Sequence, residues 1–236
     1  MITRILAAAV VLVAVAFGNT ALEPAQRNAD WTKRHEGFVA RAAQGRIDLV
    51  FIGDSITDGW RKVGLPVWEK YYGAWQAVNF GIGADRTQNL LWRLPRGELD
   101  GITPRVVVLL IGTNNIGLER SGKIRNPTAE AIAGVMAVVG LIRAKLPSSR
   151  LLLLGIFPRG EVGAPIRAQL AEVNAALARL DDGKQVRFLD IGASFLESDG
   201  SIARAVMPDL LHPSERGYEI WAKAMEPTLA ALMAKR

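Results

Sequence analysis

Five short apolar runs constrain the fold of this chain more than any other feature. Each run is rich in Val, Ile or Leu and is bounded by Gly, Pro, Asn or Asp; they lie at residues 49–52, 77–80, 106–111, 151–155 and 186–190. Their apolar residues are continuous instead of alternating with polar ones, which is typical of strands buried on both faces. The runs therefore predict a parallel sheet that is covered by helices.

Helical segments alternate with these runs. Periodic apolar residues and boundary prolines predict helices at 87–94, 127–146, 166–180 and 214–235, with Asn126 as the cap of the second. Strands and helices that alternate along the whole chain indicate a doubly wound α/β sandwich. Right-handed crossovers then bring the residues that follow each strand to one edge of the sheet, where a functional site is expected.

The first 21 residues differ from the rest of the chain. Arg4 precedes an unbroken apolar run at 5–17, which is shorter than the roughly 20 residues that a membrane-spanning helix needs. We interpret residues 1–21 as a signal peptide with candidate cleavage sites after Gly18 and Ala21, and an uncleaved anchor as the alternative. Residues 22–236 show no repeat and no long linker, so we expect a single exported domain, periplasmic or secreted, without stable membrane insertion.

The composition excludes several classes of function. The 236 residues include no cysteine, which rules out disulfides, thiolate metal sites and a cysteine nucleophile. The net charge is +6, but Lys and Arg are scattered among acidic residues in runs no longer than two. Because a nucleic-acid-binding protein gathers its basic residues into a patch, we expect solvated surface charges and no nucleic-acid partner.

Ser55 follows the first predicted strand directly, within the sequence Gly53-Asp54-Ser55. It can cap the next helix, because Ser55 and Asp58 have the spacing of a capping box. It can also be a nucleophile, which would require a base and an acid that orients the base. The two roles make different demands on the rest of the chain.

The chain contains two histidines. His35 lies in a charged stretch before the first predicted strand, and we expect it at the surface. His212 follows Asp209 by three residues, just before the last helix. This spacing lets the carboxylate reach one ring nitrogen while the other faces a serine. Asp209 and His212 are thus the candidate acid and base for Ser55.

Acyl transfer also requires hydrogen-bond donors for the oxyanion that develops at the carbonyl. Three candidate donors follow predicted strands: the backbone N–H of Ser55, an N–H of the Gly83-Ala84 turn, and the side-chain amide of Asn114. An isolated Asn114 would be interpreted as a turn residue. Together with the candidate triad, the three donors favour a catalytic role for Ser55.

Two other classes of protein are disfavoured. The sequence Gly81-Ile82-Gly83 suggests a dinucleotide site, but Arg86 stands where the third glycine belongs, and the motif follows the second strand. A non-catalytic binding module on the same scaffold would lack part of the triad, which is complete here.

Four sequence blocks occur in order along the chain: FIGDSITDGW, NFGIGADRTQNLLWRL, LLIGTNN and PDLLHPSERGY. They resemble the blocks of the SGNH (GDSL) hydrolases, in particular the branch of the platelet-activating-factor acetylhydrolase catalytic subunits and their bacterial relatives. The resemblance extends from Leu49 to the last helix. It implies a flavodoxin-like α/β fold, a three-layer sandwich with a central five-stranded parallel sheet. It also implies a serine esterase that needs neither metal nor organic cofactor.

The resemblance assigns roles to individual residues. Ser55 corresponds to the nucleophile, and Asp209 and His212 to the acid and base. Asn114 corresponds to the family's side-chain oxyanion donor, beside the backbone N–H of Ser55.

The second block departs from the family pattern at one position. Ala84 stands where the family usually has a glycine that donates its N–H to the oxyanion, so Gly83 is the alternative donor. Asn115 replaces a more widespread aspartate, but the branch named above has asparagine there too.

The acyl group is indicated by three neighbours of the catalytic residues. Ile56, Thr113 and Leu211 each adjoin one of them, and we expect them to crowd the acyl side of the site. This favours acetyl or another short acyl group, and ordinary packing is the alternative role. A homodimer is left open by the family resemblance.

The alcohol half of the substrate is less constrained. Trp60, Trp92 and Phe157 either form an aromatic wall for a sugar or belong to the core. An exported esterase of this family would remove O-acetyl groups from carbohydrate, by analogy. A lipid or thioester substrate, and acyl transfer to an acceptor, remain alternatives.

Overall fold

The computed structural model describes residues 18–119 and 121–234. Its centre is one parallel sheet with the strand order β2-β1-β3-β4-β5. The strands are β1 (Leu49–Gly53), β2 (Ala77–Gly81), β3 (Val106–Leu110), β4 (Arg150–Leu154) and β5 (Val186–Leu189). Each coincides with one of the five apolar runs to within one residue at either end. The predicted α/β fold with a five-stranded parallel sheet is therefore confirmed.

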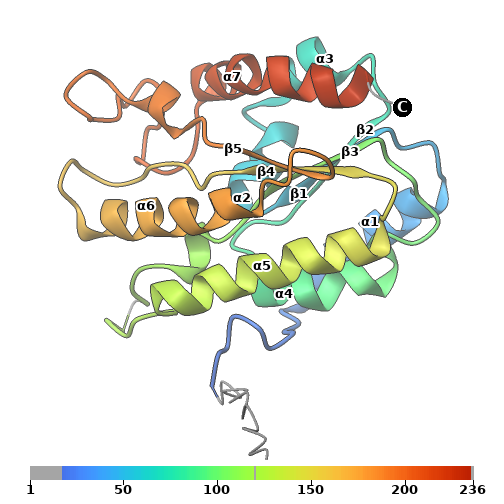
Figure 1. The fold of residues 1–236 in the computed structure, drawn as a ribbon, viewed down its shortest axis with the longest axis horizontal. Helices are drawn as coiled ribbons and strands as arrows, with labels where there is room; N and C mark the ends of the chain where they lie inside the picture. The colour runs from blue at the N-terminus through green and yellow to red at the C-terminus, as the bar shows by residue number, and fades with distance from the viewer. Residues whose placement is uncertain (1–17, 120, 235–236) are drawn as a thin grey trace, which may run out of the picture.

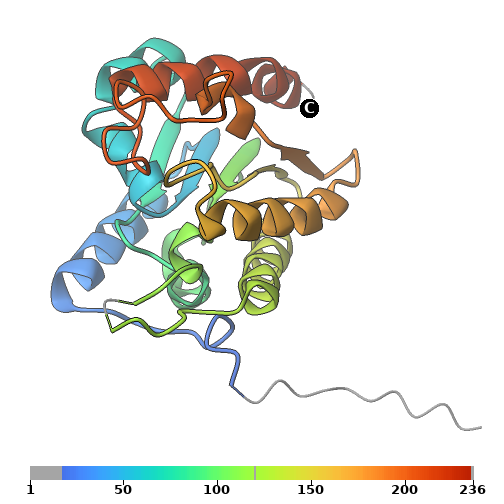
Figure 2. The same ribbon diagram turned by 90° about the vertical axis from the view of Figure 1, so that its left-hand side faces the viewer.

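Helices cover both faces of the sheet (Figures 1 and 2). One face carries α3 (Leu65–Tyr72) and α7 (Glu215–Ala234). The other carries α1 (Ala29–Ala43), α4 (Thr87–Arg93), α5 (Thr128–Lys145) and α6 (Pro165–Leu177). Short helical turns complete the chain: α2 (Ser55–Asp58), η1 (Gly59–Arg61), η2 (Leu94–Glu98), η3 (Thr113–Asn115), η4 (Ala178–Leu180) and η5 (Gly192–Phe195).

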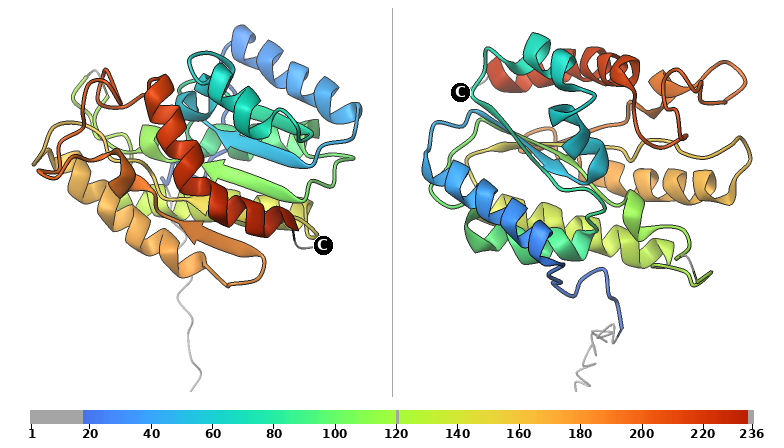
Figure 3. Two further views of the ribbon diagram at one scale, coloured as in Figure 1. Left: turned by 90° about the horizontal axis from the view of Figure 1, so that it is seen from above. Right: turned by 180° about the vertical axis from the view of Figure 1, so that it is seen from behind.

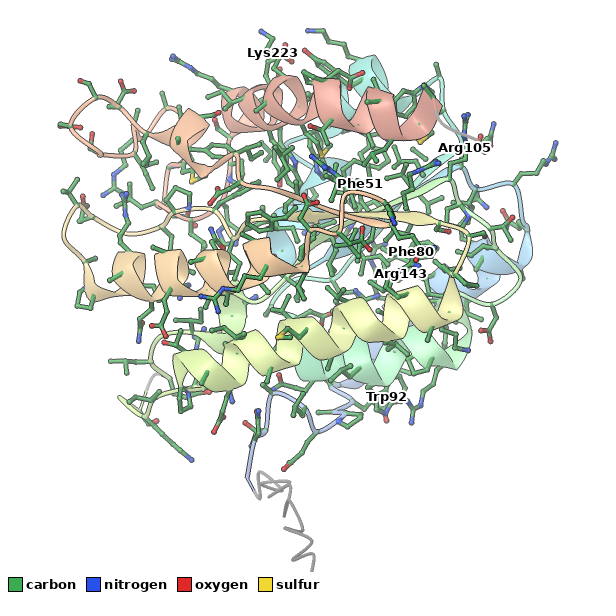
Figure 4. All side chains as sticks on the ribbon, viewed as in Figure 1. Phe51, Phe80, Trp92, Arg105, Arg143 and Lys223 are labelled. Atoms are coloured by element: carbon green, nitrogen blue, oxygen red, sulfur yellow. The ribbon has the colours of Figure 1, made fainter. Side chains whose placement is uncertain are left out.

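The strands are apolar throughout because both of their faces are buried. Along β1, Val50 and Ile52 pack against the layer of α1, α4, α5 and α6, whereas Leu49 and Phe51 pack against the layer of α7 and α3. Phe51 and Phe80 lie at the centre of the molecule, whereas Lys223 points outward from α7 (Figure 4). The two-sided core is the physical reason for the continuous pattern in the sequence.

Two helices were not predicted from the sequence, α1 and α3. The buried face of α1 is formed by Trp31, His35, Phe38 and Ala42, separated by charged residues that conceal the period. The expectation that His35 lies at the surface is wrong. His35 is buried, and its Nδ1 lies 2.7 Å from Glu98 Oε1. The start of α5 is also corrected, because Pro127 and not Asn126 occupies its cap.

The segment that precedes α1 is packed on the body of the protein. Asn19 and Ala21 are buried, and the Ala21 carbonyl accepts a hydrogen bond from the Thr87 hydroxyl at 2.8 Å. Most of the predicted signal peptide, residues 1–17, lies outside the described residues. In the part of the chain that the structure describes, no helix combines the length and the apolar composition needed to cross a membrane.

The carboxyl ends of the strands meet at one edge of the sandwich. The long loops that lead into α6 and α7 lie together there, at the left of Figure 1, and the view from above in Figure 3 shows them on the same side. Every sequence block that carries a predicted catalytic residue follows a strand or precedes α7. The topology therefore gathers the blocks into one site.

Candidate active site

Ser55 is the first residue of α2, directly after β1. The helix is capped by Asp54, whose side chain accepts a hydrogen bond from the Ile56 N–H at 3.0 Å. The capping role considered for Ser55 is wrong, because Asp54 is the cap, and Asp58 pairs with Arg61 at 2.5 Å. The Ser55 hydroxyl is thereby left to face His212 Nε2, at 2.8 Å.

Two glycines let α2 lie close against the sheet. A Cβ on Gly53 would collide with the Thr57 side chain and the Leu110 carbonyl, and a Cβ on Gly81 would collide with the backbone at Asp58. Only glycine leaves room for this approach of helix to strand. The sharp turn from β1 into α2 therefore presents Ser55 at the edge of the sheet.

Asp54 is buried beneath this turn. Its Oδ1 caps α2, while its Oδ2 has no hydrogen-bond partner. Burial raises the pKa of Asp54 to about 7, against the opposing effect of the Ile56 N–H, and the nearby charge of Asp85 raises it further. A buried carboxyl that is neutral over much of the acidic range thus adjoins the candidate nucleophile.

His212 and Asp209 lie on the loop before α7. His212 Nδ1 is 2.6 Å from Asp209 Oδ2, and the His212 backbone N–H donates to Asp209 Oδ1 at 2.7 Å. The carboxylate therefore holds both the ring and the backbone of His212. Burial alone would raise the pKa of Asp209, but the hydrogen bonds from His212 outweigh it and lower the pKa below its usual value. Asp209 is thus kept as an anion beside the imidazole.

The backbone at Ala84 explains how an alanine can occupy the position of a glycine. Ala84 has φ +62°, in the left-handed region that glycine favours, whereas Gly83 does not have a positive φ. Neither the N–H of Ala84 nor that of Ser55 donates a hydrogen bond to another described residue. The turn is close to the nucleophile, since a Cβ on Gly83 would lie 3.9 Å from the Ser55 Cβ.

Arg27 holds this turn from outside. Its Nη1 donates to the Gly83 carbonyl at 2.6 Å and lies 3.3 Å from Asp85 Oδ1. In a trans peptide the C=O and N–H groups point in opposite directions, so this bond turns the Ala84 N–H away from Arg27. From the far side, the Asn114 side chain donates to the Asp85 carbonyl at 3.0 Å. Two of the three predicted oxyanion donors are therefore linked through Asp85.

A set of buried charges lies under the same turn. The Arg93 side chain is fully buried; its Nε donates to Asp85 Oδ2 at 2.9 Å, and its Nη1 bonds to Glu98. Arg93 Nη2 also donates to the Phe80 carbonyl at 2.7 Å. This corrects the expectation of solvated charges. Asp85 and Glu98 lie only eight and five residues from Arg93 in the chain, but this spacing does not show that the three side chains are buried together.

Asn115 is not part of the site. Its Oδ1 accepts a hydrogen bond from the Thr87 N–H at 3.0 Å, at the start of α4, and its amide donates to Asn126 at 3.1 Å. Asn115 therefore fixes α4 relative to the loop after β3. Its neighbour Asn114 is half-buried and faces the turn at Asp85.

The predicted acyl-side residues differ in accessibility. Ile56 and Thr113 are buried at 1% and 2% exposure, whereas Leu211 is half-buried and lines a groove beside the triad. Ile56 and Thr113 thus belong to the wall behind the catalytic residues. Their influence on acyl length stays a prediction.

The aromatic wall expected for a sugar is not present. Trp60 and Phe157 are buried in the core between the sheet and α7. Trp92 packs against Trp31 and His35, with ring centroids 5.2 Å and 5.4 Å away. Their roles are those of core aromatics.

The described residues include no candidate metal centre. Among residues 18–119 and 121–234, no group of three or more His, Cys, Asp or Glu side chains is arranged to hold a metal ion. The chemistry that the described residues offer is a hydroxyl, an imidazole, a carboxylate and three N–H donors.

Comparisons with known proteins identify the family of the chain. Residues 51–220 match the model of the GDSL-like lipase/acylhydrolase family. The chain belongs to this family. It is 36% identical to human platelet-activating factor acetylhydrolase IB subunit alpha1 over 218 residues, which cover 92% of this chain and 90% of the relative. The family and its esterase members identify the chain as a carboxylic ester hydrolase.

Solved structures show the same fold. A Streptococcus pneumonia protein described as a platelet activating factor superposes with a TM-score of 0.68 at 25% identity, over 85% of this chain and 95% of that one. The acetylxylan esterase Axe2 from Geobacillus stearothermophilus superposes with a TM-score of 0.61 at 20% identity, over 80% and 94% of the two chains. The second likeness concerns the fold alone.

Proposed function

We propose that this chain is a serine esterase that releases short acyl groups, acetyl above all, through an acyl-enzyme on Ser55. One observation carries the proposal: the contacts Ser55–His212 and His212–Asp209, at 2.8 and 2.6 Å, align hydroxyl, base and acid. These distances are those of a nucleophile within reach of its base and a base within reach of its orienting acid.

The reaction would proceed in two halves. His212 Nε2 takes the Ser55 proton as Oγ attacks the ester carbonyl, and Asp209 stabilises the imidazolium that forms. The N–H groups of Ser55 and Ala84 and the amide of Asn114 would hold the oxyanion. His212 then returns the proton to the leaving alcohol. Water, activated by the same base, hydrolyses the acyl-enzyme and frees the acid.

The preference for a short acyl group rests on the wall behind the nucleophile. Ile56 is buried, and its carbonyl accepts a hydrogen bond from the Tyr218 hydroxyl at 2.7 Å, which fixes the backbone beside Ser55. Thr113 is buried beside Asn114. A long acyl chain would have to displace packed side chains, which typically costs about 1–3 kcal/mol.

The natural substrate we favour is an O-acetylated carbohydrate. The acetylxylan esterase that shares the fold supports this by its name, and the human relative's name supports an acetyl group on a different alcohol. A lipid or thioester substrate, and acyl transfer to an acceptor other than water, use the same acyl-enzyme and are the alternatives.

We also propose that the protein is exported. The apolar run at 5–17 supports a signal peptide, and the burial of Asn19 and Ala21 favours cleavage before Asn19 over cleavage after Ala21. The intact mass of protein purified from a periplasmic or culture fraction tests this. A chain that retains Met1, found only in the cytoplasm, would overturn it.

The test of the activity is hydrolysis of p-nitrophenyl acetate, butyrate and octanoate by the wild type, Ser55→Ala and His212→Ala. We expect activity that falls from acetate to octanoate and is lost in both variants, and release of acetate from acetylated xylan. Efficient octanoate hydrolysis would contradict the short acyl group. A folded protein without activity on any ester would favour a non-catalytic binding module.

A further inference from the structure

A groove of about 600 Å³ opens beside the candidate triad. Asp209 and Leu211 line it on one side, and Leu118 and Ile124, which are joined by an isolated β-bridge, line it on the other. Both Leu118 and Ile124 are exposed, so the groove is open and mostly apolar. Arg159 is the one arginine among the described residues that line it.

Arg159 and its neighbour Arg125 have no carboxylate partner among the described residues. Arg159 Nη2 donates to the Ile116 carbonyl at 2.9 Å, and Arg125 Nη1 to the Asn114 carbonyl at 3.3 Å. In each, Nε is buried without an acceptor. Within the described residues, neither guanidinium lies within 4.0 Å of a carboxylate, although the fully buried Arg93 is paired with two.

The nearby carboxylates do not balance the positive charges of these two arginines. Burial lowers the pKa of Arg159, the positive charge of Arg125 lowers it further, and the negative charge of Asp54 opposes both. Asp209 lines the same groove, but its oxygens are occupied by His212 and by the Leu211 N–H. Glu119, which lies near Arg125, is bonded to Arg86 at 2.7 Å. A half-buried guanidinium group whose positive charge is not paired with a carboxylate attracts an anion. The planar arrangement of its N–H donors matches carboxylate and phosphate groups.

The two arginines lie beside residues of the candidate site. Arg125 holds the backbone of Asn114, a predicted oxyanion donor, and Arg159 shares the groove with Leu211, the residue before His212. Ile56 and Thr113 are buried and leave no open space beside the nucleophile, whereas the groove lined by Asp209 and Leu211 is open. If the acyl group lies against Ile56 and Thr113, as proposed above, the groove is the space for the alcohol half of the ester.

We propose that Arg159, assisted by Arg125, forms an anion-binding subsite for the alcohol half of the substrate. The ligand class is an acetyl ester whose alcohol carries a carboxylate or a phosphate beside an apolar face, and an acidic O-acetylated carbohydrate belongs to this class. The inference rests on the proposed esterase activity and adds a charge preference to it.

The test compares three acetate esters: methyl 4-acetoxybenzoate, which is neutral, 4-acetoxybenzoate, which carries a carboxylate, and 4-acetoxyphenyl phosphate. The measured quantity is kcat/KM of each anionic ester divided by that of the neutral ester. Intrinsic differences in ester reactivity cancel when this ratio is compared between wild type and variants. Comparison of the carboxylate with the phosphate shows which anion the subsite prefers.

We expect the ratio to fall about tenfold in Arg159→Gln, because a charge-assisted hydrogen bond is lost. Arg159→Lys should keep part of it, and Arg125→Gln should lower it as well. Arg204→Gln is the matched control, since Arg204 already pairs with Glu161 at 3.1 Å and should leave the ratio unchanged. High salt should reduce the wild-type ratio.

The two levels of the proposal fail differently. A wild type that hydrolyses none of the three esters would remove the esterase activity and the subsite with it. A wild type that hydrolyses the neutral ester, with the same ratio in wild type, Arg159→Gln and Arg159→Lys, would overturn the subsite alone.

Discussion

The oxyanion side and the acid–base side of this site are held in place by different means. The Gly83-Ala84 turn lies over a buried set of charges that includes Arg93 and Asp85. Asp209 and His212 lie on a loop, with side chains 55% and 44% exposed, and are bonded mainly to each other. The first side also depends on the long-range contacts Arg27–Gly83 and Asn114–Asp85, whereas the second joins neighbours three residues apart.

The difference separates what each side contributes to stability and to catalysis. A buried ion pair that loses one partner leaves an uncompensated charge, which destabilises the fold strongly. An exposed ion pair contributes little to stability. Substitutions on the oxyanion side should therefore affect folding and geometry together, whereas substitutions on the acid–base side should affect chemistry alone.

The largest effect is expected on the exposed side. Asp209→Asn should lower kcat/KM for p-nitrophenyl acetate about 10⁴-fold, because the amide no longer holds the His212 tautomer or stabilises the imidazolium. The free energy of unfolding, from urea titration, should change by less than about 1 kcal/mol. Asp199→Asn, on the exposed loop before Asp209, is the control and should retain activity. A loss of several kcal/mol in the free energy of unfolding would show that the acid–base side also supports the fold, which contradicts the difference proposed between the two sides.

The largest effect on stability is expected at Arg93. Arg93→Met should lower the free energy of unfolding by about 5 kcal/mol, because Asp85 and Glu98 both lose their buried cation. Arg204→Met, at a side chain 63% exposed, should change it by less than about 1 kcal/mol. Urea unfolding of the two variants measures the difference. Equal stabilities would show that the buried charges do not support the turn.

Asp54 should make stability fall as the pH rises. Its folded-state pKa of about 7 lies above the unfolded value of about 3.8, so its contribution is full below pH ~4 and is lost as the pH passes ~7. The loss amounts to about 4 kcal/mol and should be absent in Asp54→Asn. Unfolding measured at intervals from pH 4 to pH 8 gives the two curves. Parallel curves would contradict the raised pKa.

Arg27 should affect turnover more than substrate binding. Arg27→Gln frees the Gly83 carbonyl and lets the Ala84 N–H turn, so kcat should fall about tenfold to a hundredfold, while KM changes less than about threefold. Arg27→Lys should restore part of kcat. Arg41→Gln, in the last turn of α1 with its guanidinium on the Gly45 carbonyl, is the control. A change confined to KM would place Arg27 in substrate binding instead.

The smallest effect is expected at Ala84. Ala84→Gly should raise the free energy of unfolding by about 0.5–1 kcal/mol, because the left-handed conformation strains alanine more than glycine. Activity should be retained, since the N–H remains. Ala231→Gly, at an exposed position inside α7, should instead lower stability by about 1 kcal/mol. If both variants changed the free energy of unfolding in the same direction, the result would argue against strain at Ala84.

The same division explains what the sequence could predict. The buried strands have a local signature, and Asp209 and His212 are near neighbours, so both the sheet and the pair could be inferred from the chain. Arg27 and Gly83 are 56 residues apart and meet only in the fold. His35 was misplaced because the charged residues around it conceal the apolar face of α1. The sequence could not show that Asp54 caps α2 instead of Ser55, because both residue types can cap a helix and the two are adjacent.

The central claim is that Ser55 is a nucleophile activated by His212. The most direct measurement is peptide mass spectrometry after reaction with a fluorophosphonate. The Ser55 oxygen forms a bond to phosphorus, fluoride leaves, and the hydroxyl proton passes to His212. We predict one adduct, on the peptide that contains Ser55, with labelling much slower in His212→Ala and absent in Ser55→Ala. A folded protein that is labelled at another residue, or equally fast without His212, would contradict the account.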